Sequence, residues 1–164
     1  MEPTRIEENG CTETYFGDVK MPHYAGVLDE LHQVTADWNV SGVLGDCRVF
    51  EVCVKNGFEF DGCSIPRALW RLCGEPFEAP RVSAALAHDW LYAAHVCDRE
   101  TADGIFREIC KMVGVGAIRR NVEYWALRMF GGVAWKSHEA QDENFANAHG
   151  ALWLGGEIQK ENKK

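Results

Sequence analysis

Four polar side chains that could do chemistry interrupt an otherwise apolar stretch of the sequence, and they are His88, Asp89, Tyr92 and His95. The surrounding alanines and leucines predict a helix from Pro80 to about His95. On that helix His88 and Tyr92 share one face, and Asp89 is rotated by about 100° from His88. His95 returns close to the His88 face after two turns. Burial of a histidine beside an aspartate is costly unless each is hydrogen-bonded or metal-bound, so another element must supply a partner.

The next predicted helix, residues 99–113, offers that partner in Asp103. Asp98 precedes it as a predicted N-cap. If the two helices pack antiparallel across the short turn between them, Asp103 comes opposite His88 or Tyr92. A carboxylate in that place fixes the imidazole tautomer and stabilises the charged form during proton transfer. The pattern therefore predicts an Asp–His pair suited to general acid–base chemistry.

The loop that precedes the first helix, Asp-Gly-Cys-Ser-Ile-Pro-Arg at 61–67, is the second candidate part of the site. Loops of this kind often present functional groups. In a functional reading Asp61 joins Asp89 and loop carbonyls around a hard cation, and Ser64 and Arg67 face the substrate. In the alternative reading Asp61 and Ser64 are only turn and cap residues.

A structural interpretation is equally open for the helical cluster. His88, Tyr92 and Asp103 would then form a buried hydrogen-bond network that fixes the packing of two helices. Three tryptophans are expected in the core, and they are Trp70, Trp90 and Trp125.

The elements around these residues predict an α+β domain, in which a small N-terminal β-hairpin region packs on three longer helices. Residues 48–60 contain two β-rich runs around Asn56-Gly57, a pattern typical of a hairpin. Residues 27–43 stay open between a helix and a strand, because their apolar positions fit both periods in part.

The third long helix is expected from about Ala117 to Phe130. Gly131-Gly132 should end it. Its apolar positions fall on one stripe, which contains Ile118, Val122, Trp125 and Met129. The expected organisation is an N-terminal arm over 1–47, a core over 48–135 and a C-terminal extension over 136–164.

Composition narrows the class of partner. The 164 residues carry a formal net charge of −8, with 25 acidic and 17 basic side chains, and this argues against a nucleic-acid surface. No stretch has the apolar length of a signal peptide or a transmembrane segment, so we expect synthesis in the cytoplasm. The seven cysteines have no regular framework, which favours reduced, mostly buried thiols.

Three ordered motifs resemble the domain-of-unknown-function family 1353, which occurs widely in tailed bacteriophages and prophages. They are Gly57-Phe-Glu-Phe-Asp-Gly-Cys-Ser-Ile-Pro-Arg-Ala-Leu-Trp70, Ala87-His-Asp-Trp-Leu-Tyr92 and Ala102-Asp-Gly-Ile-Phe106. The likeness continues through Gly114-Val115 and Tyr124-x-x-x-Arg128-x-x-Gly131, and so covers roughly 48–135. It implies a phage-type protein made in the bacterial cytoplasm, and it assigns no activity.

A shorter stretch is similar to the calcium-dependent secretory phospholipases, whose active site also has His-Asp-x-x-Tyr on one helix and Asp-x-x-Phe on the antiparallel one. This resemblance implies that His88 is the general base, that Asp103 orients it, that Tyr92 bonds to Asp103 and that Asp89 binds Ca²⁺. The sequence lacks the glycine-rich calcium loop and the cysteines that flank the His-Asp pair in those enzymes, so residues 61–64 would have to replace that loop.

Two functions from different classes follow. The first is metal-assisted hydrolysis of an ester, such as a phospholipid, by water that His88 activates. The second is a non-catalytic virion or tail-associated component, in which the aromatic residues Phe145 and Trp153 dock other virion proteins. A third interpretation, a metal-dependent phosphohydrolase with ligands among His23, His32 and His95, has less support because the spacing of these histidines is not diagnostic.

Overall fold

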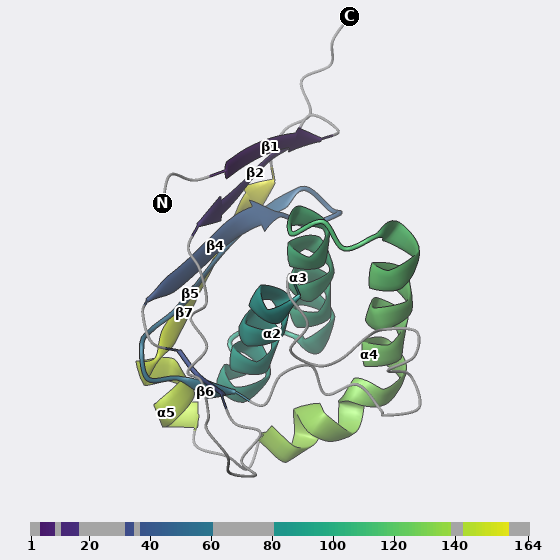
Figure 1. Ribbon diagram of the computed structural model, residues 1–164. Helices are drawn as coiled ribbons and strands as arrows, with labels where there is room; N and C mark the ends of the chain where they lie inside the picture. Colours follow the sequence, from purple (N-terminus) through teal and green to yellow (C-terminus); the bar gives the residue numbers. More distant parts are fainter. Residues whose placement is uncertain are drawn as a thin grey trace, which may run out of the picture.

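An antiparallel sheet lies against one side of a group of helices in this computed structural model (Figure 1), which describes residues 4–8, 11–16, 32–34, 37–60, 81–138 and 143–157. The predicted α+β class is confirmed. The described strands are β1 Thr4–Glu8, β2 Cys11–Phe16, β3 His32–Gln33, β4 Trp38–Val43, β5 Arg48–Val54, β6 Glu59–Phe60 and β7 Gly150–Glu157. The described helices are α2 Val82–Ala94, α3 Arg99–Met112, α4 Ala117–His138 and α5 Glu143–Ala148.

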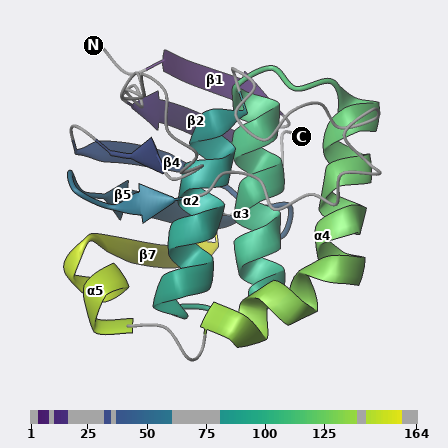
Figure 2. The same ribbon diagram turned by 60° about the horizontal axis from the view of Figure 1, so that its bottom comes forward.

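The main sheet has the strand order β1-β2-β4-β5-β7, with every neighbouring pair antiparallel. Burial alternates along its central strands: Phe50, Val52 and Val54 of β5 are buried, whereas Glu51 is exposed. This two-residue period is typical of a sheet with one face on the core and the other in water. Helices α2 and α3 contact β5 and β4, and Figure 2 shows both helices across that face.

The predicted hairpin over 48–60 is wrong. A turn does lie at Asn56-Gly57, where Gly57 has a φ of 92°, but β5 and β6 do not pair. The edges of β5 are occupied by β4 and β7, so no edge is left for β6, which pairs with β3 instead. The open segment 27–43 is a strand where the structure describes it, since β4 begins at Trp38. The C-terminal part of the chain contains β7, which pairs with β5 at one edge of the main sheet.

Helices α2 and α3 follow the sequence closely. Nearly every side of α2 is buried, as its alanine-rich composition requires, and Trp90 belongs to the core as expected. The α2 helix ends at His95, which has the left-handed φ of 47°. Asp98 caps α3 as predicted, and its carboxylate accepts hydrogen bonds from the backbone N–H of Thr101 at 2.9 Å and from the Thr101 hydroxyl at 2.8 Å.

Helix α4 departs from the prediction in its length and in the direction that it faces. It continues through Gly131-Gly132 to His138 instead of ending there. It packs on α3 and α2, which lie between it and the sheet (Figure 1). Trp125 is exposed, so its expected place in the core is wrong, and the predicted apolar stripe points to solvent. Among the described residues, no helix combines the length and apolar character that crossing a bilayer would require.

Candidate functional site

The antiparallel pair α2 and α3 brings three of the predicted residues into direct contact. The short connection at 95–98 turns the chain back, and α3 then places Asp103 opposite both His88 and Tyr92. Nε2 of His88 lies 3.0 Å from Oδ1 of Asp103, and the Tyr92 hydroxyl donates to the same oxygen at 2.7 Å. The sequence alone did not decide between the two partners, and the structure contains both contacts.

Arg128 completes the set of donors around Asp103. Its guanidinium Nη1 donates to Oδ2 of Asp103 at 2.9 Å, on the side of the carboxylate away from His88 and Tyr92. The Asp103 side chain is completely buried, so these three donors replace the water that a carboxylate would otherwise bind. We call His88, Tyr92, Asp103 and Arg128 the Asp103 cluster.

The electrostatics of this cluster favour a charged Asp103. Burial raises the pKa of its carboxyl, but the hydrogen bonds from His88, Tyr92 and Arg128 and the charge of His88 outweigh that effect, and the pKa lies below its usual value. Burial and the contact with the Asp103 carboxylate raise the pKa of Tyr92, which is therefore a neutral donor at ordinary pH. The hydrogen bond to Asp103 also raises the pKa of Arg128.

The imidazole of His88 is held from several sides. Its ring centroid is 4.0 Å from that of Tyr92 and 5.4 Å from that of Phe106, which meets it edge-on. Nδ1 lies 4.0 Å from Oδ1 of Asp89, which is beyond hydrogen-bonding distance. His88 as a whole is 5% exposed. Nε2 is directed at Asp103, and Nδ1 lies on the side of Asp89.

Sequence reasoning missed Arg128 as a site residue, although it lies in the Tyr124-x-x-x-Arg128-x-x-Gly131 pattern. The closeness of α4 to the cluster depends on Gly131, because a Cβ there would lie 2.7 Å from the Tyr92 hydroxyl oxygen. Arg99 lies between α3 and α4 and donates to the carbonyls of Leu127 and Arg128. Arg128 and Gly131, three residues apart in the sequence, were the available signal that this helix approaches the Asp103 carboxylate closely.

A second buried ion pair was also missed. Arg81 and Glu123 are almost fully enclosed, and Nη1 of Arg81 lies 2.6 Å from Oε1 of Glu123. Arg119 donates to the same oxygen at 3.2 Å. This pair ties the start of α2 to the inner side of α4, and nothing in the local sequence pattern distinguishes Glu123 from a surface glutamate.

The remaining predicted site residues are not brought into the cluster by the described structure. Asp61, Ser64 and Arg67 lie outside the described residues, as does Trp70. Asp89 is partly buried beside His88. Within the described residues, no group of three or more histidine, cysteine, aspartate or glutamate side chains has the geometry to hold a metal ion.

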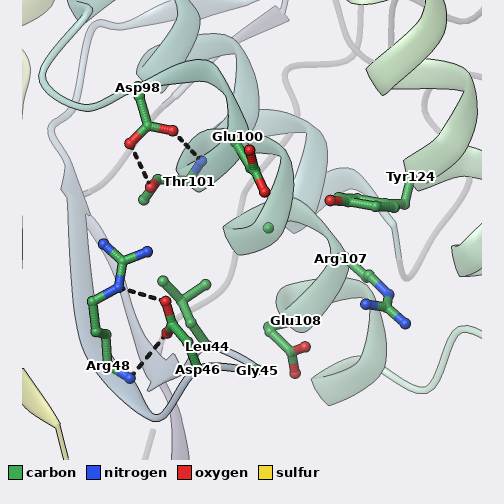
Figure 3. A pocket seen from close by; sticks show the side chains of 11 residues that line it. Leu44, Gly45, Asp46, Arg48, Asp98, Glu100, Thr101, Arg107, Glu108 and Tyr124 are labelled. Carbon is green, nitrogen blue, oxygen red and sulfur yellow. Dashed lines mark hydrogen bonds and ion pairs between the residues drawn. The ribbon is translucent and has the colours of Figure 1, made fainter.

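A polar cavity of about 430 Å³ lies between the β4–β5 turn, α3 and α4, apart from the Asp103 cluster (Figure 3). Its charged lining is largely paired: Arg48 bonds to Asp46, and Asp98 caps α3. Tyr124 of α4 closes one side. Neither His88 nor Asp103 lines this cavity, so it offers no route to the predicted chemistry.

Comparison with known proteins identifies a family, and the description of that family assigns no activity. The family described as "Protein of unknown function (DUF1353)" matches residues 33–127, which include β4, α2, α3 and the first half of α4. An "Uncharacterized protein y4jT" from Sinorhizobium fredii is 28% identical over 78 residues, which are 48% of this chain. The match spans 23% of that relative's length. No solved structure matches.

Proposed function

Since the chain belongs to the DUF1353 family, whose description assigns no activity, we propose a function from the Asp103 cluster itself: hydrolysis of an ester bond, with His88 as the general base. The observation that carries the proposal is the 3.0 Å contact of His88 Nε2 with the buried, charged Asp103. This contact directs Nε2–H to the carboxylate and puts the lone pair on Nδ1, next to Asp89.

The chemical steps follow from this tautomer. Nδ1 of His88 accepts a proton from water while the water oxygen bonds to the ester carbonyl carbon. Collapse of the tetrahedral intermediate breaks the bond to the alkoxide leaving group, which takes the proton back from Nδ1. Asp103 stabilises the imidazolium between these steps, and Tyr92 and Arg128 hold Asp103 in place. A phospholipid is the proposed substrate, because His88, Asp89 and Tyr92 follow each other on α2 in the His-Asp-x-x-Tyr order that resembles the secretory phospholipases.

Calcium is part of the proposal. Asp89 is the proposed calcium ligand that lies within the described residues. When bound, a divalent cation would stabilise the oxyanion of the intermediate. Calcium takes about six to eight oxygen ligands, so Asp89 needs partners from outside the described residues, and Asp61 is the proposed one. The expected effect of Asp89→Asn is loss of any calcium dependence of turnover.

Substitution of two histidines on α2 tests the proposal. His88→Asn should lower turnover of a soluble nitrophenyl ester, or of phosphatidylcholine with added calcium, by about 10²–10⁴-fold, the usual contribution of a general base. His95→Asn is the matched control, because His95 contacts Trp135 and lies outside the Asp103 cluster. Circular dichroism must show that both variants are folded. Absence of His88-dependent turnover on both substrate classes would end the hydrolase proposal.

A second candidate function is a non-catalytic virion or tail-associated component, in which the Asp103 cluster only fixes helix packing. Burial favours it: Asp103 is enclosed and His88 is nearly so, whereas Phe145 and Trp153 in the C-terminal part are exposed. It predicts a fixed number of copies in purified phage particles and no turnover that His88→Asn abolishes. Detection of His88-dependent turnover excludes a purely structural role.

A further inference from the structure

Arg99, the first residue of α3, binds the backbone of α4 in the middle of that helix. Its guanidinium Nη1 donates to the carbonyl oxygens of Leu127 and Arg128, both at 3.2 Å, and its Nη2 donates to the Arg128 carbonyl at 3.3 Å. Basic side chains usually bind helix carbonyls in the last turn, where those carbonyls lack a partner within the helix. Leu127 and Arg128 instead lie about three turns before the end of α4 at His138. The contact is therefore not a helix cap.

The carbonyls that Arg99 binds belong to the turn of α4 that presents Arg128 to Asp103. Arg99 and Asp103 are four residues apart in the sequence, so they lie on one side of α3, about one turn apart. Nη1 of Arg99 lies 4.0 Å from Oδ2 of Asp103, beyond hydrogen-bonding distance, whereas Nη1 of Arg128 donates to the same oxygen at 2.9 Å. Arg99 thus holds the backbone of the residue whose side chain binds the carboxylate.

The orientation of the Asp103 carboxylate depends on donors at both of its oxygens. His88 and Tyr92 both meet Oδ1, and Arg128 is the described side chain that donates to Oδ2. Without a donor at Oδ2 the carboxylate is free to turn, because the last torsion of aspartate has broad minima. The Arg128 side chain is long and flexible, so the place of its guanidinium depends on the place of its backbone. A fixed Arg128 backbone therefore helps to fix which oxygen of Asp103 faces His88.

We propose that Arg99 is a positioning residue of the Asp103 cluster, an inference that rests on the proposed hydrolysis. Through Nη1 and Nη2 it holds the α4 backbone at Arg128, and so keeps Asp103 aligned with Nε2 of His88. Arginine suits this role because its planar fork presents several N–H groups in a fixed geometry, which a lysine ammonium does not. The Arg99 side chain is 25% exposed, so its replacement opens no large cavity in the core.

Nuclear magnetic resonance of isotope-labelled histidine tests the alignment without turnover. The Nε2–H proton of His88 is directed at a carboxylate, so the wild type should give a downfield, slowly exchanging signal that His88→Asn removes. Arg99→Gln should move this signal upfield and speed its exchange by about tenfold, the effect of weakening a hydrogen bond to a charged group. Arg99→Lys should act in nearly the same way, because one ammonium does not reproduce the two-donor contact.

The matched control is Arg120→Gln. Arg120 also donates to a backbone carbonyl, that of Val115 at 3.2 Å, but it lies outside the Asp103 cluster. Its replacement should leave the His88 signal unchanged. Circular dichroism and urea unfolding must show that every variant is folded.

Turnover of the nitrophenyl ester is the second readout. Arg99→Gln and Arg99→Lys should each lower kcat by about 10- to 100-fold and leave KM unchanged, because a misalignment of about 1 Å costs the reaction without weakening substrate binding. Arg120→Gln should leave both constants unchanged.

Several results would overturn the positioning role of Arg99. They are absence of the downfield His88 signal from the wild type, an unchanged signal in Arg99→Gln, and equal shifts in Arg99→Gln and Arg120→Gln. Full recovery of the wild-type signal and kcat in Arg99→Lys would show that Arg99 acts by charge alone, which also contradicts this role. Absence of wild-type turnover would end the proposed hydrolysis, whereas the His88 signal would still decide whether Arg99 aligns Asp103.

Discussion

The adjacent glycines of α4 allow a test of how tightly this helix holds the Asp103 cluster. Alanine at either position should gain up to about 1 kcal/mol of helix propensity. At Gly132 the new Cβ meets no described atom within 4 Å, so Gly132→Ala should stabilise the fold by up to that amount. At Gly131 the Cβ would lie 2.7 Å from the Tyr92 hydroxyl oxygen. Tyr92 is buried and bonded to Asp103, so it cannot swing away freely.

Overpacking of that kind costs about 1–3 kcal/mol. Displacement of the Tyr92 hydroxyl also weakens a hydrogen bond to a charged group, worth about 1.5–3 kcal/mol. After the helix-propensity gain, Gly131→Ala should lower the free energy of unfolding by about 1.5–5 kcal/mol. With a urea m-value of about 2 kcal/mol/M, its midpoint should fall by about 1–2.5 M and that of Gly132→Ala should rise. Equal stabilisation by both substitutions would refute the close approach of α4 to Tyr92.

Two further substitutions test the buried carboxylates. Asp103→Asn should lower the free energy of unfolding by about 3–5 kcal/mol at neutral pH, since it leaves Arg128 without its buried partner. The folded-state pKa of Asp103 lies below the ordinary 3.8. The wild type should therefore be more stable than Asp103→Asn at pH above 3.8, and this difference in the free energy of unfolding should disappear as the pH falls through the lowered pKa. Urea unfolding of both proteins at neutral and acidic pH measures the difference. Glu123→Gln should also cost about 3–5 kcal/mol in the same assay, because Arg81 is enclosed, whereas Glu100→Gln at an exposed carboxylate should cost at most about 1 kcal/mol. An Asp103→Asn loss below that of Glu100→Gln would contradict a buried, charged Asp103.

The helical part of the site was predictable because its signals are local. The Asp98 cap and the short connection at 95–98 fix an antiparallel pair, and a helical period then places His88, Tyr92 and Asp103 on facing sides. Arg128 was not predictable in this way, since it reaches Asp103 from a third helix that is 25 residues further along the chain. Its contact depends on how α4 crosses α3, which no short pattern specifies.

The sheet shows the complementary limit. Asn56-Gly57 correctly indicates a tight turn, but a turn does not decide which strands pair on either side of it. Strand β5 has a better partner in β7, which is about a hundred residues away in sequence and pairs with it across Val52 and Val54. A hairpin prediction weighs only neighbours in the chain, so competition from a distant strand is invisible to it.

The orientation of α4 shows what an apolar period along a helix can and cannot predict. Periodicity correctly groups Ile118, Trp125 and Met129 on one stripe, and the usual inference is that such a stripe faces the core. The core instead takes the opposite side of the helix, because Glu123 and Arg128 have buried partners of opposite charge in Arg81 and Asp103. Two ion pairs thus fix the inner side of α4 and leave the apolar stripe exposed. An apolar stripe shows which residues share a side of a helix, without specifying whether that side faces the core.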